Sequence, residues 1–171
     1  MFKLLFAELM YNNEIEIYKD IIPWLENRLK GDYGRKAKKI TVLDTHDSDL
    51  SNFIIKLKYQ RFFSDFTTYK IRQDITGFIE YEDKVDLVFV EVKIGQLKLI
   101  DLSQLIGYSC IPNPLPIFSI LIAPAGMGST LAKLLTSFNR RDILEFRPGR
   151  KIEVLKWDEK KQDIDRMNSI T

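Results

Sequence analysis

Residues 85–93 read VDLVFVEVK, and the interpretation of the whole chain starts from this stretch. Its run of apolar, largely β-branched side chains is typical of a strand that is buried on both faces of a sheet. Such a strand should carry no charge near its middle, yet this one ends in Glu91 and Lys93. Because successive side chains of a strand alternate between its two faces, Glu91 and Lys93 lie on the same side. The stretch therefore predicts a charged site at the end of a buried strand.

The preceding residues, 74–81, are expected to pair with 85–93 as a hairpin around a short acidic turn. A turn centred between the two segments places Asp74 directly opposite Glu91, with Cβ atoms about 5 Å apart on one face. Asp86 is a rival acid, but it lies on the opposite face of the strand and about 16 Å from Glu91. We therefore assign Asp86 to the turn end of the hairpin and pair Asp74 with Glu91.

Two facing carboxylates repel each other, at a cost of up to about 1 kcal/mol when solvated and more when partly buried. A divalent cation between them removes that cost, and Mg²⁺ typically takes one or two carboxylates, with waters and substrate phosphate as its other ligands. Asp74 and Glu91 are accordingly predicted to bind Mg²⁺, with Mn²⁺ as a substitute and the Val92 carbonyl as a further oxygen ligand. Lys93 can orient or help to deprotonate the attacking water, or neutralise charge on a phosphate. These residue types indicate a metal-dependent phosphodiesterase site.

Asp74, sixteen intervening residues and then Glu91-Val92-Lys93 resemble the core motif of the PD-(D/E)XK nuclease superfamily. Type II restriction enzymes, archaeal Holliday-junction resolvases and exonuclease domains share that motif. The resemblance spans about residues 14–124. It implies that Asp74 and Glu91 hold the metal and that Lys93 is catalytic.

The predicted helix 99–110 carries Gln104 and Tyr108 four positions apart. This pair resembles the Gln-x-x-x-Tyr element that follows the core motif in some branches of the superfamily. The resemblance implies that Gln104 supports the site or contacts DNA, with Tyr108 as a weaker candidate for nucleic-acid contact. The alternative for both is a neutral polar pair on a helix surface.

The chain departs from the superfamily pattern at one position, because Gln73 rather than proline precedes Asp74. Many members also use an acid from a helix near the N-terminus. Glu14, Glu16 and Glu26 are the candidates for that role, and the sequence does not choose among them.

The predicted fold class is α/β, with a restriction-endonuclease-like αβββαβ core and a central mixed sheet flanked by helices. We expect one domain over residues 1–171, with its core at about 14–124, a C-terminal helix and strand within 128–157, and a polar, frayed tail at 158–171. The individual elements are expected as helices over 14–30, about 49–63, 99–110 and the segment after 128, and as strands over 40–44, 66–72, 74–81, 85–93, 116–124 and 150–157.

Composition excludes several classes of function. The net charge of +2 does not by itself indicate a nucleic-acid partner. With one cysteine, Cys110, and one histidine, His46, an intrachain disulfide is impossible, and zinc enzymes and Cys-His nucleophiles have very little support.

Glu8 interrupts the apolar N-terminal stretch, which we interpret as the start of an element rather than a signal peptide. We expect an intracellular, cytoplasmic protein without a membrane span.

Two clusters of basic residues are candidate phosphate contacts. Residues 28–39 hold six basic residues against one acid, and the alternative to a nucleic-acid contact is a solvated loop. The candidates in this segment are Arg35, Lys36, Lys38 and Lys39. The second cluster, equally ambiguous, consists of Arg140, Arg141, Arg147, Arg150 and Lys151.

Two further segments receive a structural interpretation. Residues 125–130, AGMGST, lack the Gly-Lys-Ser/Thr ending of a nucleotide-binding P-loop, so we expect a turn and no nucleotide cofactor. The acidic stretch around His46 lacks the glycine and distal glutamate of an EF-hand loop, and we expect Ser48 or Asp49 to cap a helix there.

The sequence therefore predicts a Mg²⁺-dependent nuclease of the PD-(D/E)XK type, either an endonuclease or an exonuclease, that hydrolyses phosphodiester bonds, with DNA as the favoured substrate and RNA not excluded. A symmetric homodimer is compatible with this function. The alternative is a catalytically silent nucleic-acid-binding or assembly module on the same fold.

Overall fold

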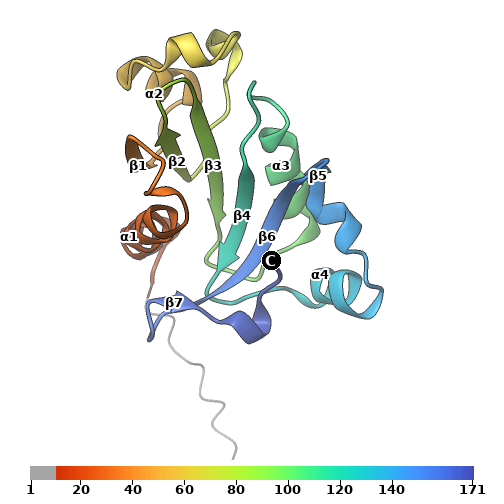
Figure 1. Cartoon of the computed structure of the whole chain (residues 1–171). Coiled ribbons are helices and arrows are strands. Elements are labelled where there is room, and N and C mark those ends of the chain that lie inside the picture. The colour runs from red at the N-terminus through yellow and green to blue at the C-terminus, as the bar shows by residue number, and fades with distance from the viewer. Residues whose placement is uncertain (1–10) are drawn as a thin grey trace, which may run out of the picture.

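The computed structural model describes residues 11–171, so the N-terminal segment that contains Glu8 lies outside the described residues. Within the described part, seven strands form one open mixed sheet that helices flank on both faces (Figure 1). The elements are α1 (Glu14–Tyr33), β1 (Lys39–Asp44), α2 (Leu50–Lys56), β2 (Ile75–Glu80), β3 (Val85–Val92), α3 (Leu99–Ser109), β4 (Phe118–Ala123), α4 (Ser129–Ala132), β5 (Glu145–Arg147), β6 (Arg150–Asp158) and β7 (Asp163–Ile164), with short 3₁₀ or π turns η1 (Gln60–Phe62), η2 (Phe66–Thr68), η3 (Lys133–Ser137), η4 (Arg141–Leu144) and η5 (Arg166–Asn168).

The sheet has the strand order β1-β2-β3-β4-β6-β5, and β7 pairs with β6. The first three strands form an antiparallel meander, whereas β3, β4 and β6 run parallel to one another. The parallel connections pass through α3 and α4, as crossovers between parallel strands require. The carboxyl ends of β3, β4 and β6 consequently lie at one end of the sheet, near the start of α1.

Helix α1 begins with a reciprocal cap: the Asn13 side chain accepts from the Glu16 amide at 3.1 Å, and the Glu16 carboxylate accepts from the Asn12 amide at 2.7 Å. Its buried face carries Ile17, Ile21, Leu25 and Leu29, spaced four apart as the sequence predicts. Pro23 does not split the helix, which continues to Tyr33.

Two hydrophobic cores cover the two faces of the sheet. Helix α1 packs on one face, against alternate side chains of β2, β3 and β4. Helices α2, α3 and α4 pack on the other face, over Phe78, Leu87, Phe89 and Leu121. Because β3 is covered on both sides, its apolar residues are almost all fully buried. This explains why residues 85–93 form a near-continuous apolar run.

The predicted hairpin register is confirmed. Ile75 lies opposite Val90 and Glu80 lies opposite Val85, which is the register that brings Asp74 against Glu91 at the next position. Strand β2 begins only at Ile75, so Asp74 belongs to a bend that precedes the strand.

The predicted strand over 66–72 is wrong. Residues Phe66–Thr68 form the turn η2, and no ladder is formed by the residues that follow it, up to 74. Aromatic and threonine residues favour strands, but local polar contacts stabilise a turn here. Thr68 Oγ1 donates to the Asp65 carbonyl at 2.8 Å, and the Tyr69 hydroxyl donates to the Asp65 carboxylate at 2.6 Å. The helix expected over about 49–63 is also too long.

Helix α2 ends at Lys56, and Lys58 adopts a left-handed conformation with φ 62°. Asp49 occupies the predicted N-cap position, but its side chain makes no capping hydrogen bond. It instead accepts from Arg72 Nε at 3.0 Å.

The predicted frayed tail is wrong as well. Residues after 158 form β7 and η5, and Ile170 is buried against β6. The Ile170 backbone exchanges two hydrogen bonds of 2.8 Å with Val154. The tail is polar overall, so its sequence gives no sign that Ile170 is buried. Backbone pairing with Val154 holds this one apolar residue against β6. Within residues 11–171, no helix has the length and apolar character that crossing a membrane would require.

Candidate active site

Asp74 is held where β2 begins and β3 ends. Its Oδ1 accepts from the Tyr18 hydroxyl at 2.6 Å, and its Oδ2 accepts from the Val92 amide at 2.7 Å. Tyr18 comes from α1 and Val92 from the last position of β3, so two elements fix this carboxylate. Burial and the hydrogen bond to Asp74 raise the pKa of Tyr18 far above its ordinary value. The phenol therefore remains a hydrogen-bond donor throughout the physiological pH range.

Glu91 lies at the end of β3 and is 3% exposed. Its Oε1 receives Lys93 Nζ at 2.8 Å and Gln104 Nε2 at 3.3 Å. The lysine follows two residues later in the chain, whereas the glutamine reaches the site from α3. The structure thus brings together the predicted residues Glu91, Lys93 and Gln104.

The carboxyl group of Glu91 resists ionisation. Burial, together with the nearby charge of Asp74, raises its pKa to about 7, and the ion pair with Lys93 opposes this shift only in part. Burial disfavours the ionised carboxyl, and the charge of Asp74 adds negative charge that Lys93 offsets only in part. Such a surplus is the condition that a bound cation relieves.

Lys93 is placed between two acids. Besides Glu91, its Nζ lies 3.9 Å from the Glu14 carboxylate at the start of α1. Burial lowers the pKa of Lys93, but the hydrogen bond to Glu91 and the charges of Glu91, Asp74 and Glu14 outweigh it and raise the pKa. Lys93 is therefore an ammonium ion at neutral pH.

Of the three N-terminal glutamates, only Glu14 lies at this site. Burial raises its pKa, with a smaller contribution from Asp74 and an opposing one from Lys93. Glu16 belongs to the helix cap described above, and Glu26 pairs with Lys30 at 2.5 Å in the middle of α1. The start of α1 thus adds one acid to the carboxylate pair.

Two other predicted site residues have mainly packing roles. The side chain of Val92 is fully buried in the core under α1, while its amide serves Asp74. Tyr108 is partly buried and packs against the core on the α3 face. Gln73, beside Asp74, is 1% exposed, and neither of its amide atoms has a hydrogen-bond partner among the described residues.

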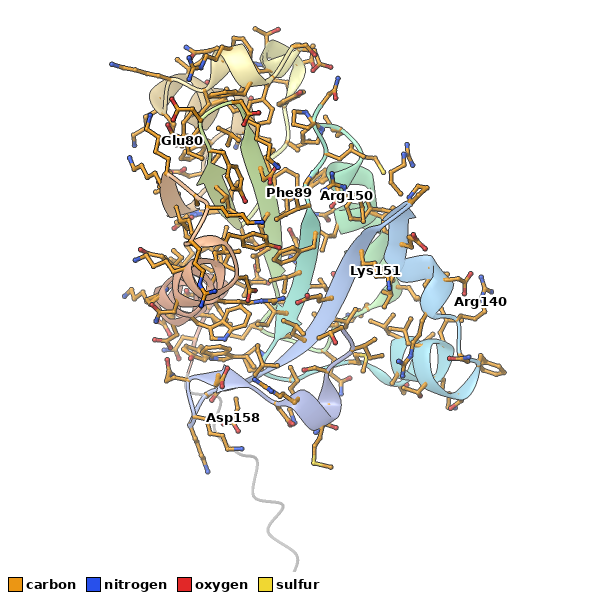
Figure 2. All side chains as sticks on the ribbon, viewed as in Figure 1. Glu80, Phe89, Arg140, Arg150, Lys151 and Asp158 are labelled. Atoms are coloured by element: carbon orange, nitrogen blue, oxygen red, sulfur yellow. The ribbon has the colours of Figure 1, made fainter. Side chains whose placement is uncertain are left out.

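The first basic cluster lies away from the carboxylates. Its four candidates occupy the connection from α1 to the first residue of β1, and Lys39 pairs with Glu80 at the hairpin end of the sheet. The carboxylate end of β1 is Asp44, five positions further on, or about 17 Å along the strand. Glu80 marks this distant end in Figure 2.

The second basic cluster is also separate from the site. Arg150 and Lys151 open β6, at the end opposite to Asp158, and Arg140 lies beside α4 (Figure 2). Arg140 is engaged by Asp142, with contacts of 2.8 and 2.9 Å. Neither basic cluster flanks the carboxylates.

The donor set at the site fits Mg²⁺. The described residues contain no group of three or more His, Cys, Asp or Glu side chains placed to hold a metal. Mg²⁺ needs fewer protein ligands than that, because it usually keeps several waters and binds one or two carboxylates. Asp74 and Glu91 supply two hard oxygen ligands, and the pKa of Glu91 is raised first by its burial and then by the charge of Asp74. Residues 11–171 can therefore supply a two-carboxylate site.

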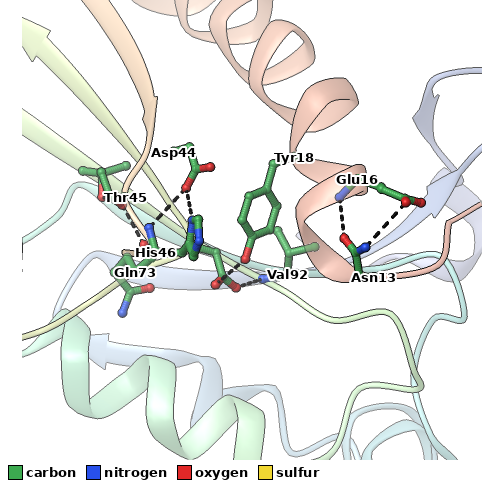
Figure 3. A network of polar contacts seen from close by, with 10 residues as sticks. Asn13, Glu16, Tyr18, Asp44, Thr45, His46, Gln73 and Val92 are labelled. Atoms are coloured by element: carbon green, nitrogen blue, oxygen red, sulfur yellow. Dashed lines mark hydrogen bonds and ion pairs between the residues drawn. The ribbon is translucent and has the colours of Figure 1, made fainter. Parts of the chain in front are cut away.

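Sequence reasoning missed three neighbours of the site (Figure 3). Tyr18 donates to Asp74, and its ring lies 5.7 Å from that of His46. His46 in turn contacts Asp44 at 2.5 Å. Tyr18 is four residues after Glu14, so helical spacing placed it on the same face. The position of His46 depended on the path of the chain after β1, which carries no periodic signal.

Comparisons with protein-family models, curated proteins and solved structures found no match to this chain.

Proposed function

We propose that the chain is a metal-dependent nuclease of the PD-(D/E)XK type, which hydrolyses phosphodiester bonds in DNA. The observation that carries this proposal is the cluster of Asp74, the buried Glu91, Lys93 and Glu14 at one end of the sheet, in which burial and the charge of Asp74 raise the pKa of Glu91. Carboxylates placed together at an energetic cost are characteristic of functional sites.

The arrangement of elements around the site supports the same proposal. Helix α1, the meander β1-β2-β3, helix α3 and strand β4 follow the order αβββαβ. Helix α2 is inserted between β1 and β2. We propose that these elements form a restriction-endonuclease-like core, with the acids at the end where β3 and β4 run side by side.

Each residue has a distinct role in this proposal. A Mg²⁺ ion would supply Lewis-acid stabilisation of the phosphate as negative charge develops on it. Asp74, oriented by Tyr18 and Val92, and Glu91 would hold the ion. Gln104 fixes the Glu91 carboxylate, and the ammonium of Lys93 orients the attacking water or stabilises charge on the phosphate.

A cleavage assay tests the proposal directly. Purified protein is incubated with single-stranded, duplex and branched DNA, and with RNA, in the presence of Mg²⁺ or Mn²⁺ and then with EDTA. We expect cleavage of at least one DNA substrate that EDTA abolishes. The variants Glu91→Gln and Lys93→Met should lose activity, because each removes one charge while preserving the approximate shape of the side chain.

Asp86→Asn is the matched control. Asp86 lies on the same strand as Glu91, but it pairs with Lys84 at 2.8 Å near the hairpin turn. This variant should cleave like the parent. Equal activity of the parent, Glu91→Gln and Lys93→Met would refute the assignment of the site.

A second candidate function is nucleic-acid binding without chemistry. It is favoured by one observation: both oxygens of Asp74 already have partners within the chain. This candidate predicts salt-sensitive DNA binding that neither EDTA nor Glu91→Gln alters. Gel-shift titrations at two salt concentrations, with and without EDTA, separate the two candidates.

A further inference from the structure

A second pair of side chains stands beside the carboxylate cluster, at the end of β1. Asp44 is the last residue of β1, and its Oδ1 accepts from the His46 amide at 3.2 Å and contacts the His46 ring Nδ1 at 2.5 Å. An ionised carboxylate only accepts hydrogen bonds, so this contact assigns a proton to Nδ1. The other ring nitrogen, Nε2, is thereby left to interact with groups outside the pair.

Backbone contacts tie this pair to Asp74. Thr45, which lies between Asp44 and His46, donates its amide to the Asp74 carbonyl at 2.9 Å. Its hydroxyl donates to the Gln73 carbonyl at 2.6 Å. The segment that carries His46 is therefore held in a fixed position against the segment that carries the proposed metal ligand.

The His46 ring also reaches the site through Tyr18. The two rings are 5.7 Å apart and inclined at 58°, and the hydroxyl of Tyr18 donates to Asp74. Figure 3 shows Asp44 and His46 on one side of the Tyr18 hydroxyl and Val92 on the other. His46 remains 36% exposed in its side chain, so a substrate can approach it.

Lys93 contacts other acids than His46 does. Its ammonium lies 2.8 Å from Glu91 and 3.9 Å from Glu14. Hydrolysis of a phosphodiester is accelerated by one group that orients the attacking water and by another that donates a proton to the leaving oxygen. Lys93 and His46 are thus two separate titratable groups, each with its own acid partner.

We propose that His46, oriented by Asp44, is the general acid that protonates the leaving oxygen of the scissile phosphodiester. This inference rests on the nuclease function proposed above. It adds a catalytic residue that the Asp-Glu-Lys motif does not contain.

The water oxygen forms a bond to phosphorus while the bond from phosphorus to the leaving oxygen breaks, and that bonding pair stays on the leaving oxygen. The leaving oxygen takes the proton from His46 Nε2, and the electron pair of that N–H bond stays on the ring. The proton of the attacking water passes to solvent, and solvent returns a proton to Nε2 before the next turnover.

The charges around His46 favour its protonated form. The hydrogen bond to Asp44 raises the pKa of His46, and the charges of Asp44, Asp47 and Asp74 add to the increase, while desolvation opposes it. Tyr18, packed against the ring from α1, stays neutral because its own pKa is raised. The imidazolium is thus available near neutral pH.

Substrates with a bridging sulfur provide the test, because a thiolate leaves without protonation. Full-length protein with Mg²⁺ is assayed on matched DNA oligonucleotides that carry oxygen or sulfur at the 3′- or 5′-bridging position of one cleavable bond. The ends of the oxygen product identify which bridging position is the leaving group. The variants are His46→Gln and Asp44→Asn, with Ser48→Ala as the control in the same loop.

On the oxygen substrate, His46→Gln should lower kcat by about 100-fold or more, and Asp44→Asn by about 10-fold. On the sulfur substrate, both variants should cleave within about threefold of the parent. Ser48→Ala should match the parent on both substrates, because the hydrogen bond that the Ser48 hydroxyl makes within residues 11–171 is with the exposed Asn52 side chain, at 2.8 Å.

Three results would overturn the inference. If His46→Gln cleaves the oxygen substrate like the parent, His46 takes no part in catalysis. If it loses activity equally on both substrates while its melting temperature is unchanged, His46 acts in binding rather than as an acid. If the parent cleaves no substrate, the nuclease proposal fails and this inference fails with it.

Discussion

The two ends of the β2–β3 hairpin carry acids in different surroundings. At the turn end, Glu80 accepts from the Tyr59 hydroxyl at 2.9 Å and lies 4.0 Å from Lys38, while Asp86 pairs with Lys84 at 2.8 Å. Each of these two acids has a cation beside it. At the other end, three acids share one ammonium group.

The crowded end consists of Asp74, Glu91 and Glu14 around Lys93. The pKa values of Glu91 and Glu14 are raised there, in each case first by burial and then with a contribution from Asp74. The same pair of strands therefore has a balanced end, where Glu80 and Asp86 each have a cation, and a crowded end, where three acids surround one ammonium group. The pKa of a strand-end acid in this sheet therefore depends on its burial and on the charges that the neighbouring helix brings to it.

The largest effect should come from removing charge at the crowded end. Glu91→Gln and Lys93→Met are each expected to reduce kcat/KM by at least about 100-fold, because each removes a charge that acts on the reacting phosphate or its metal. Steady-state cleavage of the preferred DNA substrate measures the loss. Asp86→Asn, at the balanced end, should stay within twofold, and a comparable loss there would break the comparison.

Stability should depend on pH through Glu91. The pKa of Glu91 is about 7 in the folded chain and 4.5 in the unfolded reference. Between these values, the folded state keeps a proton that the unfolded state has released, so the free energy of unfolding falls as pH rises from 4.5 to 7. The total decrease is of the order of 3 kcal/mol. Urea unfolding in EDTA at several pH values measures this decrease.

Glu91→Gln is the matched variant for that measurement. It removes the titrating group, so its stability should lack this decrease over the same pH range. A parent and a variant with the same pH profile would show that Glu91 ionises normally. The surplus of charge at the crowded end would then not exist.

Divalent cations should stabilise the parent selectively. A ligand that binds only the folded state at 100 times its Kd adds about 2.7 kcal/mol to the free energy of unfolding. Melting temperatures in a Mn²⁺ or Mg²⁺ titration should therefore rise for the parent and for Asp86→Asn but not for Glu91→Gln. EDTA should reverse the rise. An equal rise in all three proteins would place the cation elsewhere.

The smallest effect concerns Gln73. Its amide is buried beside Asp74 without a hydrogen-bond partner among the described residues. Replacing such a group with an apolar side chain of similar shape removes a desolvation cost, so Gln73→Met should raise the free energy of unfolding by about 1 kcal/mol. Gln60→Met, at a half-exposed glutamine of η1, controls for the substitution itself. Destabilisation by Gln73→Met alone would show that the amide has a polar partner.

Much of this region could be predicted from the sequence because its signals are local. The apolar run of β3 indicated a strand covered on both faces, and a short turn fixed the register that places Asp74 against Glu91. Gln104 was assigned to the site from its resemblance to the Gln-x-x-x-Tyr element on the helix after that strand. These residues are close to one another along the chain, so few long-range contacts were needed to place them.

The remaining residues depended on contacts between distant segments. In the sequence, Tyr18 looks like another residue of the apolar face of a helix. Only the packing of α1 on the sheet brings its hydroxyl to Asp74. His46 sits in a turn without periodicity, and it reaches the site because Thr45 bonds to the Asp74 carbonyl. Ile170 is one apolar residue in a polar tail. No pattern in the sequence encodes such pairings, which arise when the sheet and its helices assemble.

The most direct test of the central claim is a crystal soaked in Mn²⁺ and measured at the manganese absorption edge. The account predicts one anomalous peak that lies about 2 to 2.5 Å from a carboxylate oxygen of both Asp74 and Glu91. A map with no peak there, with Asp74 still bonded to Tyr18 and Val92 and Glu91 still bonded to Lys93, would contradict it.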